Sequence, residues 1–162
     1  MCEMCKIVVK NIIDEDFVNF KAPAMFVAFP ACTFKCGREN CQNRELAAAP
    51  DIHIAPEKIA ARYAANPISE AVVLGGLDPL DSPDAALRLV HALRKVTNDP
   101  VVIYTGYDKE NLGDVLELLS FYKNIIVKFG KFVPGQKPHF DPTLGVMLAS
   151  DNQYAETIRG KE

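Results

Sequence analysis

Cysteine is absent from residues 42–162, and this absence limits how the chain can be stabilised. All five cysteines fall in two tight clusters within the first 41 of 162 residues, and their number is odd. That distribution makes a poor disulfide framework for a whole domain. Thiolates gathered this closely in a reducing compartment more often hold a metal ion or an iron–sulfur cluster.

Long apolar runs, basic charge and low-complexity tracts are also lacking. No apolar run approaches the roughly 18 residues that a membrane-spanning helix needs, and no basic segment precedes an apolar stretch at the amino terminus. The formal net charge of −3 gives no general attraction to nucleic acid phosphates. We therefore expect a globular, cytoplasmic protein whose partners include neither nucleic acid nor membrane.

The length of 162 residues suits one hydrophobic core and is short for two average domains. We predict a single domain over residues 1–162. Within it, residues 1–22 form an amino-terminal extension or strand, and residues 130–162 form a loop-rich tail.

Strand-like and helix-like segments alternate through the middle of the chain. Continuous apolar runs predict buried strands at Ala24–Phe29, Ala71–Leu74, Val101–Tyr104 and Ile125–Lys128. Helical spacing and terminal Pro or Asn residues predict helices at Pro56–Ala65, from Ser82 to about Val96, and at Lys109–Phe121. This alternation favours a parallel sheet with right-handed crossovers, in which ligands collect beyond the carboxyl ends of the strands. Cys32–Cys41, Gly75–Pro79 and Thr105–Tyr107 are all predicted to lie there.

The two ends of the chain give weaker patterns. Lys6–Asn11 predicts a strand or hairpin arm, followed by an acidic turn at Asp14–Asp16. From Gly130 onward the chain is rich in Gly and Pro, so we expect loops with short pairings near Phe129–Val133 and Leu144–Ala149.

The strongest motif is Cys32-Thr-Phe-Lys-Cys36-Gly-Arg-Glu-Asn-Cys41. Three thiolates in one loop suit a cubane 4Fe-4S cluster, and one iron then stays open to the amino and carboxylate groups of an amino acid. The alternatives are inert thiols or a zinc site, whose fourth ligand would be His53 or one of Cys2 and Cys5. No function is assigned to Cys2 and Cys5 because they lack a partner pair.

The cysteine loop resembles that of the small radical S-adenosylmethionine (SAM) activases of anaerobic ribonucleotide reductase. That family carries Cys-x3-Cys-x2-Cys, with an aromatic residue and Asn after the last cysteine. This chain has Cys41-Gln42-Asn43 and two extra residues between Cys36 and Cys41.

Further short motifs follow in the family's order. The family's Gly-Gly-Asp/Glu-Pro is similar to Gly75-Gly76-Leu77-Asp78-Pro79, with one residue inserted. Alone, such a sequence is more typical of a tight turn, but after a strand and behind a three-cysteine loop it favours binding of the methionine part of SAM. Thr105-Gly106-Tyr107 matches the family's Thr-Gly-Tyr. Two weaker matches are Phe129-Gly130-Lys131-Phe132, where the family has Asp in place of Phe129, and Ser150–Gln153, which is similar to Ser-x-Asn-Gln.

The resemblance implies a shortened, open partial (β/α) barrel of the radical SAM type, with a mostly parallel sheet. It implies a 4Fe-4S cluster on Cys32, Cys36 and Cys41. It also implies SAM as second cofactor, bound by Asn43, Gly75, Gly76, Asp78 and Thr105, with no catalytic side chain beyond the cluster and SAM.

The activity implied is reductive cleavage of SAM to a 5′-deoxyadenosyl radical, which generates a glycyl radical on a partner. That partner would be the large subunit of an anaerobic ribonucleotide reductase or a relative, and a flavodoxin- or ferredoxin-type protein would be the reductant. Two alternatives stay open. One is a radical SAM enzyme acting on another small molecule or polypeptide, and the other is a non-catalytic module that binds zinc or an iron–sulfur cluster.

Overall fold

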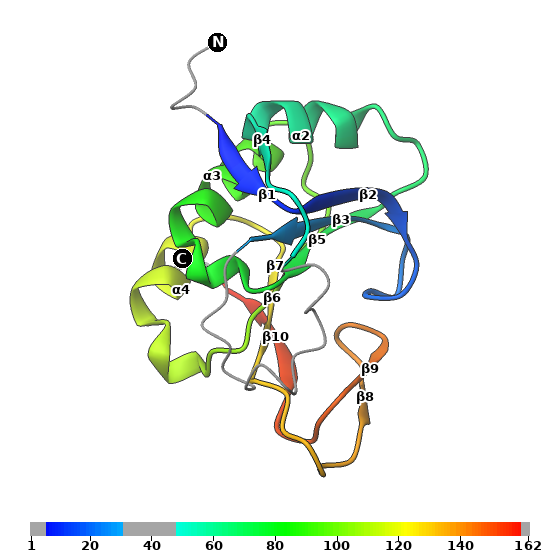
Figure 1. The fold of residues 1–162 in the computed structure, drawn as a ribbon, viewed down its shortest axis with the longest axis vertical. Coiled ribbons are helices and arrows are strands. Elements are labelled where there is room, and N and C mark those ends of the chain that lie inside the picture. Colours follow the sequence, from blue (N-terminus) through cyan, green and yellow to red (C-terminus); the bar gives the residue numbers. More distant parts are fainter. Residues whose placement is uncertain (1–5, 31–47, 160–162) are drawn as a thin grey trace.

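The computed structural model describes residues 6–30 and 48–159. Within these ranges six strands form the main sheet (Figure 1). In order across the sheet they are β10 (Tyr154–Ile158), β7 (Ile125–Phe129), β6 (Val101–Tyr104), β5 (Ala71–Gly76), β3 (Ala24–Phe29) and β2 (Asn11–Asp16). The middle strands β7, β6, β5 and β3 run parallel, and each edge strand is antiparallel to its neighbour. The prediction of a mixed α/β fold with a mostly parallel sheet is confirmed.

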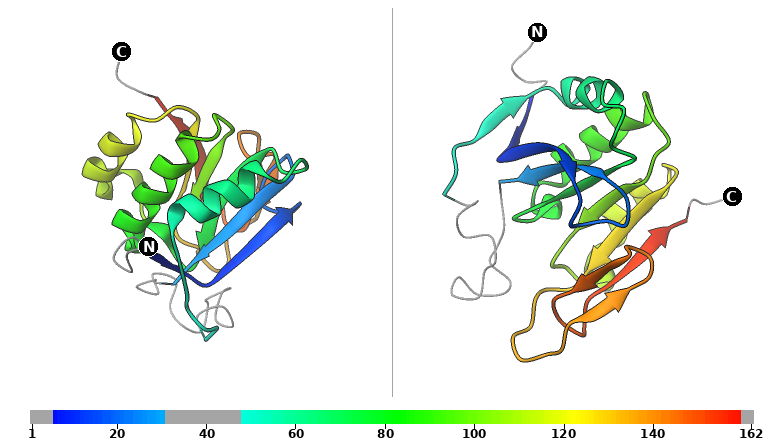
Figure 2. Two further views of the ribbon diagram at one scale, coloured as in Figure 1. Left: turned by 90° about the horizontal axis from the view of Figure 1, so that it is seen from above. Right: turned by 90° about the vertical axis from the view of Figure 1, so that its right-hand side faces the viewer.

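The helices cover one face of this sheet (Figure 2). In the described part of the chain they are α2 (Pro56–Ala64), α3 (Pro83–Arg94) and α4 (Gly113–Leu119), with short 3-10 helices η3 (Pro79–Asp81) and η4 (Lys109–Asn111). None of these helices is long and apolar enough to cross a membrane. Two smaller strand pairs lie within the same described residues: β1 (Ile7–Val9) with β4 (Ile52–Ile54), and β8 (His139–Asp141) with β9 (Val146–Leu148).

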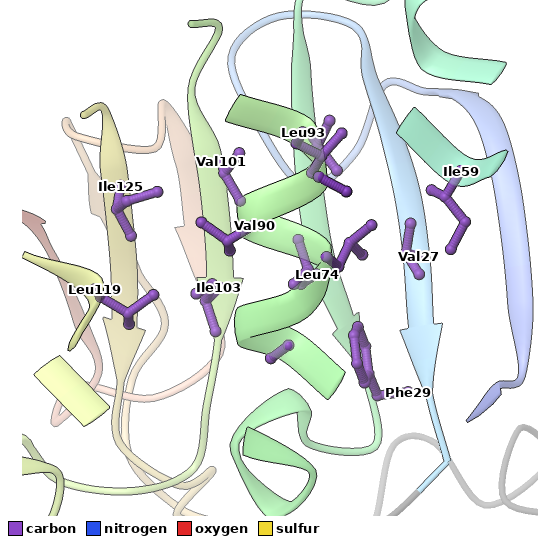
Figure 3. Packing of buried hydrophobic residues seen from close by; sticks show 14 of the residues in the cluster. Val27, Phe29, Ile59, Leu74, Val90, Leu93, Val101, Ile103, Leu119 and Ile125 are labelled. Atoms are coloured by element: carbon purple, nitrogen blue, oxygen red, sulfur yellow. The ribbon is translucent and has the colours of Figure 1, made fainter. Parts of the chain in front are cut away.

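The main core lies between the sheet and the helices. Because strand side chains alternate between faces, every second residue of each middle strand points toward the helices. Figure 3 shows these strand residues packed against helix residues, all fully buried: Val27, Leu74, Ile103 and Ile125 from the sheet, and Ile59, Val90, Leu93 and Leu119 from the helices. Burying each such side chain contributes about 1.5–3 kcal/mol, so this layer fixes the sheet against the helices.

A second, smaller core lies on the other face of the sheet. There the β2–β3 turn contributes Phe20, and the β8–β9 hairpin contributes Leu144 and Leu148. These side chains pack over Val73 and Val102. The turn and the hairpin also bond directly, because Lys21 N donates to Leu144 O at 2.8 Å.

Most predicted elements are confirmed near their expected bounds, but one predicted helix is broken. The span Lys109–Phe121 was expected to be continuous, whereas η4 ends at Asn111 and α4 begins at Gly113. Leu112, between them, closes η4 by donating its N–H to Lys109 O. Its own carbonyl then accepts from Leu116 N as α4 starts, and Gly113 is a weak helix former at this junction.

The acidic turn expected at Asp14–Asp16 is wrong, since these residues end strand β2. Arg62 of α2 binds Asp14 through both Nε, at 2.6 Å, and an Nη, at 2.8 Å. That hydrogen-bonded guanidinium lowers the pKa of Asp14. Ser69 Oγ donates to Asp14 O at 2.5 Å, and Asn66 Nδ2 to Glu15 Oε1 at 2.9 Å. Partners from the neighbouring helix and loop therefore hold an acidic segment in an edge strand.

The carboxyl-terminal part is more regular than expected. Strand β9 lies inside the predicted pairing at Leu144–Ala149, but β8 and β10 were not predicted. Residues 130–133 are not in a strand, so the pairing expected at Phe129–Val133 is wrong beyond Phe129. Strand β10 gains its stability from antiparallel pairing with the apolar β7, a long-range contact that its own short sequence does not reveal.

The substitution Gly76→Ala tests the packing at the end of β5. Gly76 has φ of +87°, and an added Cβ would lie 2.7 Å from Phe29 N. We expect a loss of about 2 kcal/mol or more in the free energy of unfolding, from backbone strain and the clash with β3. Urea denaturation measures this. The matched control is Gly113→Ala, where the Cβ meets nothing within 4 Å, and we expect it to stay within about 1 kcal/mol of the wild type. Equal midpoints for the two variants would contradict the packing argument.

Candidate functional site

The predicted cluster ligands lie outside the described residues. We call residues 31–47 the cysteine segment, because they include Cys32, Cys36 and Cys41, and they also include Asn43. The chain enters this segment directly from the carboxyl end of β3. In residues 6–30 and 48–159 no three His, Cys, Asp or Glu side chains gather into a metal site. A donor set of three closely spaced thiolates is one that iron–sulfur clusters take.

The glycine pair Gly75-Gly76 holds β5 against the strand that leads into the cysteine segment. In the parallel ladder Gly75 lies opposite Ala28, and Gly76 opposite Phe29. An added Cβ at Gly75 would lie 2.8 Å from a ring carbon of Phe26, so glycine is needed there for close packing. Leu77 N then donates to Phe29 O at 3.2 Å, which continues the pairing to the last residue of β3.

The Asp78 carboxylate joins the loops that follow β5 and β6. Asp78 is only 1% exposed. Its Oδ1 accepts a hydrogen bond from Leu80 N at 3.0 Å, and its Oδ2 accepts from Gly106 N at 2.9 Å and Thr105 Oγ1 at 3.2 Å. We call this set of bonds the Asp78 junction. A buried carboxylate needs such donors to offset its lost hydration, so the junction fixes the two loops relative to each other.

Thr105 and Tyr107 extend the Asp78 junction across the sheet. The Thr105 hydroxyl, besides donating to Asp78, accepts a hydrogen bond from Tyr107 N at 3.1 Å. The Tyr107 hydroxyl donates to the Asp81 carboxylate, and Thr105 N donates to Lys128 O at 2.9 Å. The candidate segments after β5 and β6 and the end of β7 are thereby tied into one unit.

A buried lysine lies on the face of the sheet opposite the helices. Lys128 of β7 is 6% exposed, and it is paired in register with Tyr104 of β6. Its Nζ donates to Gly130 O at 2.9 Å and lies 5.8 Å from the centre of the Tyr104 ring. Burial raises the pKa of Tyr104, and the nearby Asp16 and Asp141 carboxylates raise it further. Tyr104 therefore stays neutral beside the lysine, and its hydroxyl donates to Asn19 O at 2.5 Å.

The two weakest sequence matches meet in space. Gln153 Nε2 donates to Gly130 O at 3.2 Å, and Asn152 Nδ2 donates to Lys131 O at 2.9 Å. Gly130 has φ of +98°, and an added Cβ would lie 3.1 Å from Asn152 Nδ2. The two segments therefore form one structural corner next to the ends of β7 and β10.

Sequence reasoning and structure agree on which described segments gather. Gly75, Gly76, Asp78 and Thr105 lie together at the carboxyl ends of β5 and β6, and their role in binding SAM stays a prediction. Sequence reasoning placed Lys128 in a strand but did not recognise it as a buried charge beside these segments. The available signal was a lysine within the otherwise apolar run Ile125–Phe129, where a charged residue is unexpected in a buried strand.

Comparison with known proteins identifies the family. A family model described as a 4Fe-4S single cluster domain matches residues 23–153, which include the cysteine segment, the glycine pair and the Asp78 junction. No curated protein and no solved structure matches the chain. The predicted 4Fe-4S cluster is supported by this match, and its assignment to Cys32, Cys36 and Cys41 stays a prediction. Because the match spans most of its length, the chain belongs to the family of 4Fe-4S single cluster domains.

Proposed function

We propose that this protein is a radical SAM enzyme that cleaves SAM reductively to methionine and a 5′-deoxyadenosyl radical. The observation that carries the proposal is the Asp78 junction. It brings the Gly-Gly-Leu-Asp-Pro and Thr-Gly-Tyr segments together beside the end of β3, from which the chain runs on into three closely spaced cysteines. Ligands of parallel α/β sheets bind at this edge. The six-stranded sheet would then be a shortened, open partial barrel of the radical SAM type.

Cys32, Cys36 and Cys41 would hold the cluster, and three ligands leave one iron open to the amino and carboxylate groups of SAM. When bound and reduced, the cluster would supply one electron to the sulfonium of SAM, and an external flavodoxin- or ferredoxin-type protein would be the source of that electron. As in the family that the chain resembles, main-chain groups at Gly75 and Gly76 would bind the charged ends of the amino acid part of SAM. Asn43 would complete this binding set.

Within that site, Asp78 and Thr105 act mainly by orienting main chain. Both carboxylate oxygens of Asp78 already accept hydrogen bonds, and the Thr105 hydroxyl both donates and accepts inside the protein. Their contribution to SAM binding is then the fixed position of the Gly106 and Leu77 backbone. Catalysis depends on such preorganisation, because a misplaced ligand loses its reactive geometry.

The partner that we propose is a glycyl radical enzyme, the large subunit of an anaerobic ribonucleotide reductase or a relative. The 5′-deoxyadenosyl radical would take a hydrogen atom from a glycine Cα of the partner and leave a glycyl radical there.

One observation favours a second candidate, a radical SAM enzyme acting on another polypeptide or small molecule. Phe129, where the resembling family has an acid, is fully buried in the main core, and its ring lies 5.3 Å from that of Tyr154. An acid at this position would be buried among apolar side chains. In this chain the position therefore serves core packing and carries no acid. That difference fits a partner other than the one of the activase family that the chain resembles.

The substitution Cys36→Ala tests the cluster ligands and the reaction together. After anaerobic reconstitution with iron and sulfide and reduction with dithionite, we expect the variant to lack both the cluster and SAM cleavage. The measurements are iron content and chromatography of 5′-deoxyadenosine. Cys2→Ala is the matched control, and it should leave both nearly intact. Retained cleavage in the Cys36 variant would refute the ligand assignment, and a wild-type cluster that never cleaves SAM would favour a non-catalytic module.

The substitution Asp78→Asn tests the junction. The asparagine side chain keeps one acceptor oxygen, but its NH₂ group faces a backbone N–H that loses its acceptor. We therefore expect the free energy of unfolding to fall by about 1–3 kcal/mol. We also expect SAM cleavage to fall roughly tenfold to a hundredfold while iron content stays at the wild-type level. Asp84→Asn, at an exposed position in the first turn of α3, is the control. Cleavage at the wild-type rate in the Asp78 variant would contradict the orienting role.

A further inference from the structure

Lys10, between β1 and β2, contacts the chain on both sides of the cysteine segment. Its main-chain N–H donates to Ala28 O of β3 at 2.7 Å. Its side chain reaches the other way, where Nζ donates to Ala49 O at 2.5 Å and binds Asp51 Oδ1 at 2.8 Å. One residue thus holds the strand that enters the cysteine segment and the chain that leaves it.

The position of Lys10 is unusual for a lysine. It interrupts the apolar residues of β1 and β2, and its side chain is 9% exposed. A lysine this deeply buried must offset its lost hydration with partners, and an apolar residue would pack there at a lower desolvation cost. The ammonium group of Lys10 contacts Ala49 and Asp51, and both of these residues follow the cysteine segment in the chain.

The small β1–β4 pairing reinforces this arrangement. Val9, the residue before Lys10, pairs with Ile52, the residue after Asp51. The ladder thus fixes the register of the backbone beyond the cysteine segment next to the contacts of the lysine. Strand β4 has only three residues, so its ladder alone is short, and the lysine adds two contacts where the ladder ends.

We propose that Lys10 is a positioning residue for the cluster, because it holds the described residues on both sides of the cysteine segment, Ala28 before it and Ala49 and Asp51 after it. Holding the ends in place removes part of the entropy that the segment would otherwise lose on binding. The inference rests on the proposed cluster ligands in the cysteine segment and not on the proposed SAM chemistry, so cluster loading tests it separately from turnover.

The substitution Lys10→Met tests this role, because methionine keeps the length of the aliphatic stem and removes the three N–H donors. We expect chelators to strip iron from the reconstituted variant about tenfold faster than from the wild type. In the apo-protein, amide hydrogen exchange across residues 48–54 should be faster, while exchange in β5 and β6 stays unchanged. Lys10→Arg, which keeps the charge and the donors, should restore much of the retention.

Two further variants keep the result interpretable. Lys95→Met, at the exposed carboxyl end of α3, is the matched control and should lose iron at the wild-type rate. Asp51→Ala removes one partner of Lys10 from a half-exposed position and should accelerate iron loss in the same direction, even if the Lys10 variant does not fold. The double variant should add little beyond Lys10→Met, because both changes break the same contact.

Iron loss from the Asp51 variant, and from a folded Lys10 variant, at the wild-type rate would overturn the proposal. So would faster exchange spread evenly over the core strands, because that pattern marks general destabilisation. The electron paramagnetic resonance spectrum of the reduced protein adds an independent readout. A changed cluster signal in Lys10→Met, restored in Lys10→Arg, supports a positioning role, and an unchanged signal together with unchanged iron retention speaks against it.

Discussion

The parallel pairing of β3 with β5 is the constraint on which the rest of the site depends. The ladder continues to Phe29 and Gly76, the last residues of the two strands, and Leu77 N adds one more bond to Phe29 O. This is possible only because Gly76 adopts a positive φ and carries no Cβ to meet β3. The point where the chain turns into the cysteine segment is thereby placed beside the segment that leads to Asp78.

Two buried charged side chains then fix the segments that lie next to the β3–β5 ladder. Asp78 and Lys10 are each nine-tenths or more buried, and each binds groups from separate segments of the chain. Such groups add little net stability, because desolvation offsets most of their attraction. Their bonds are directional, however, so they select one arrangement of loops that apolar packing alone would leave loose. The apolar layers on both faces of the sheet supply the stability that this arrangement needs.

Local patterns in the sequence predict most of the fold, and they fail where long-range contacts decide. The strands Ala24–Phe29 and Val101–Tyr104 were predicted with the bounds that they have, because a continuous apolar run between two covered faces is a strong signal. Strand β10 was missed because its stability comes from β7. The acidic end of β2 was misread as a turn because its stabilising partners, such as Arg62, lie about fifty residues away.

In the candidate site, too, local patterns could be read from the sequence and long-range contacts could not. Gly75, Asp78 and Thr105 could be grouped from sequence, because consecutive parallel strands end at one edge of a sheet. What Asp78 binds could not be read, since a carboxylate after a Gly-Gly pair is equally suited to a ligand and to neighbouring amides. The sequence shows Lys10 as a charge between apolar residues, but its partners Ala49 and Asp51 could not be read, because they follow some forty residues later, across the cysteine segment. Asp78 thus stands in a motif that the sequence alone can match, whereas the bonds by which Asp78 and Lys10 hold separate segments together are visible only in the fold.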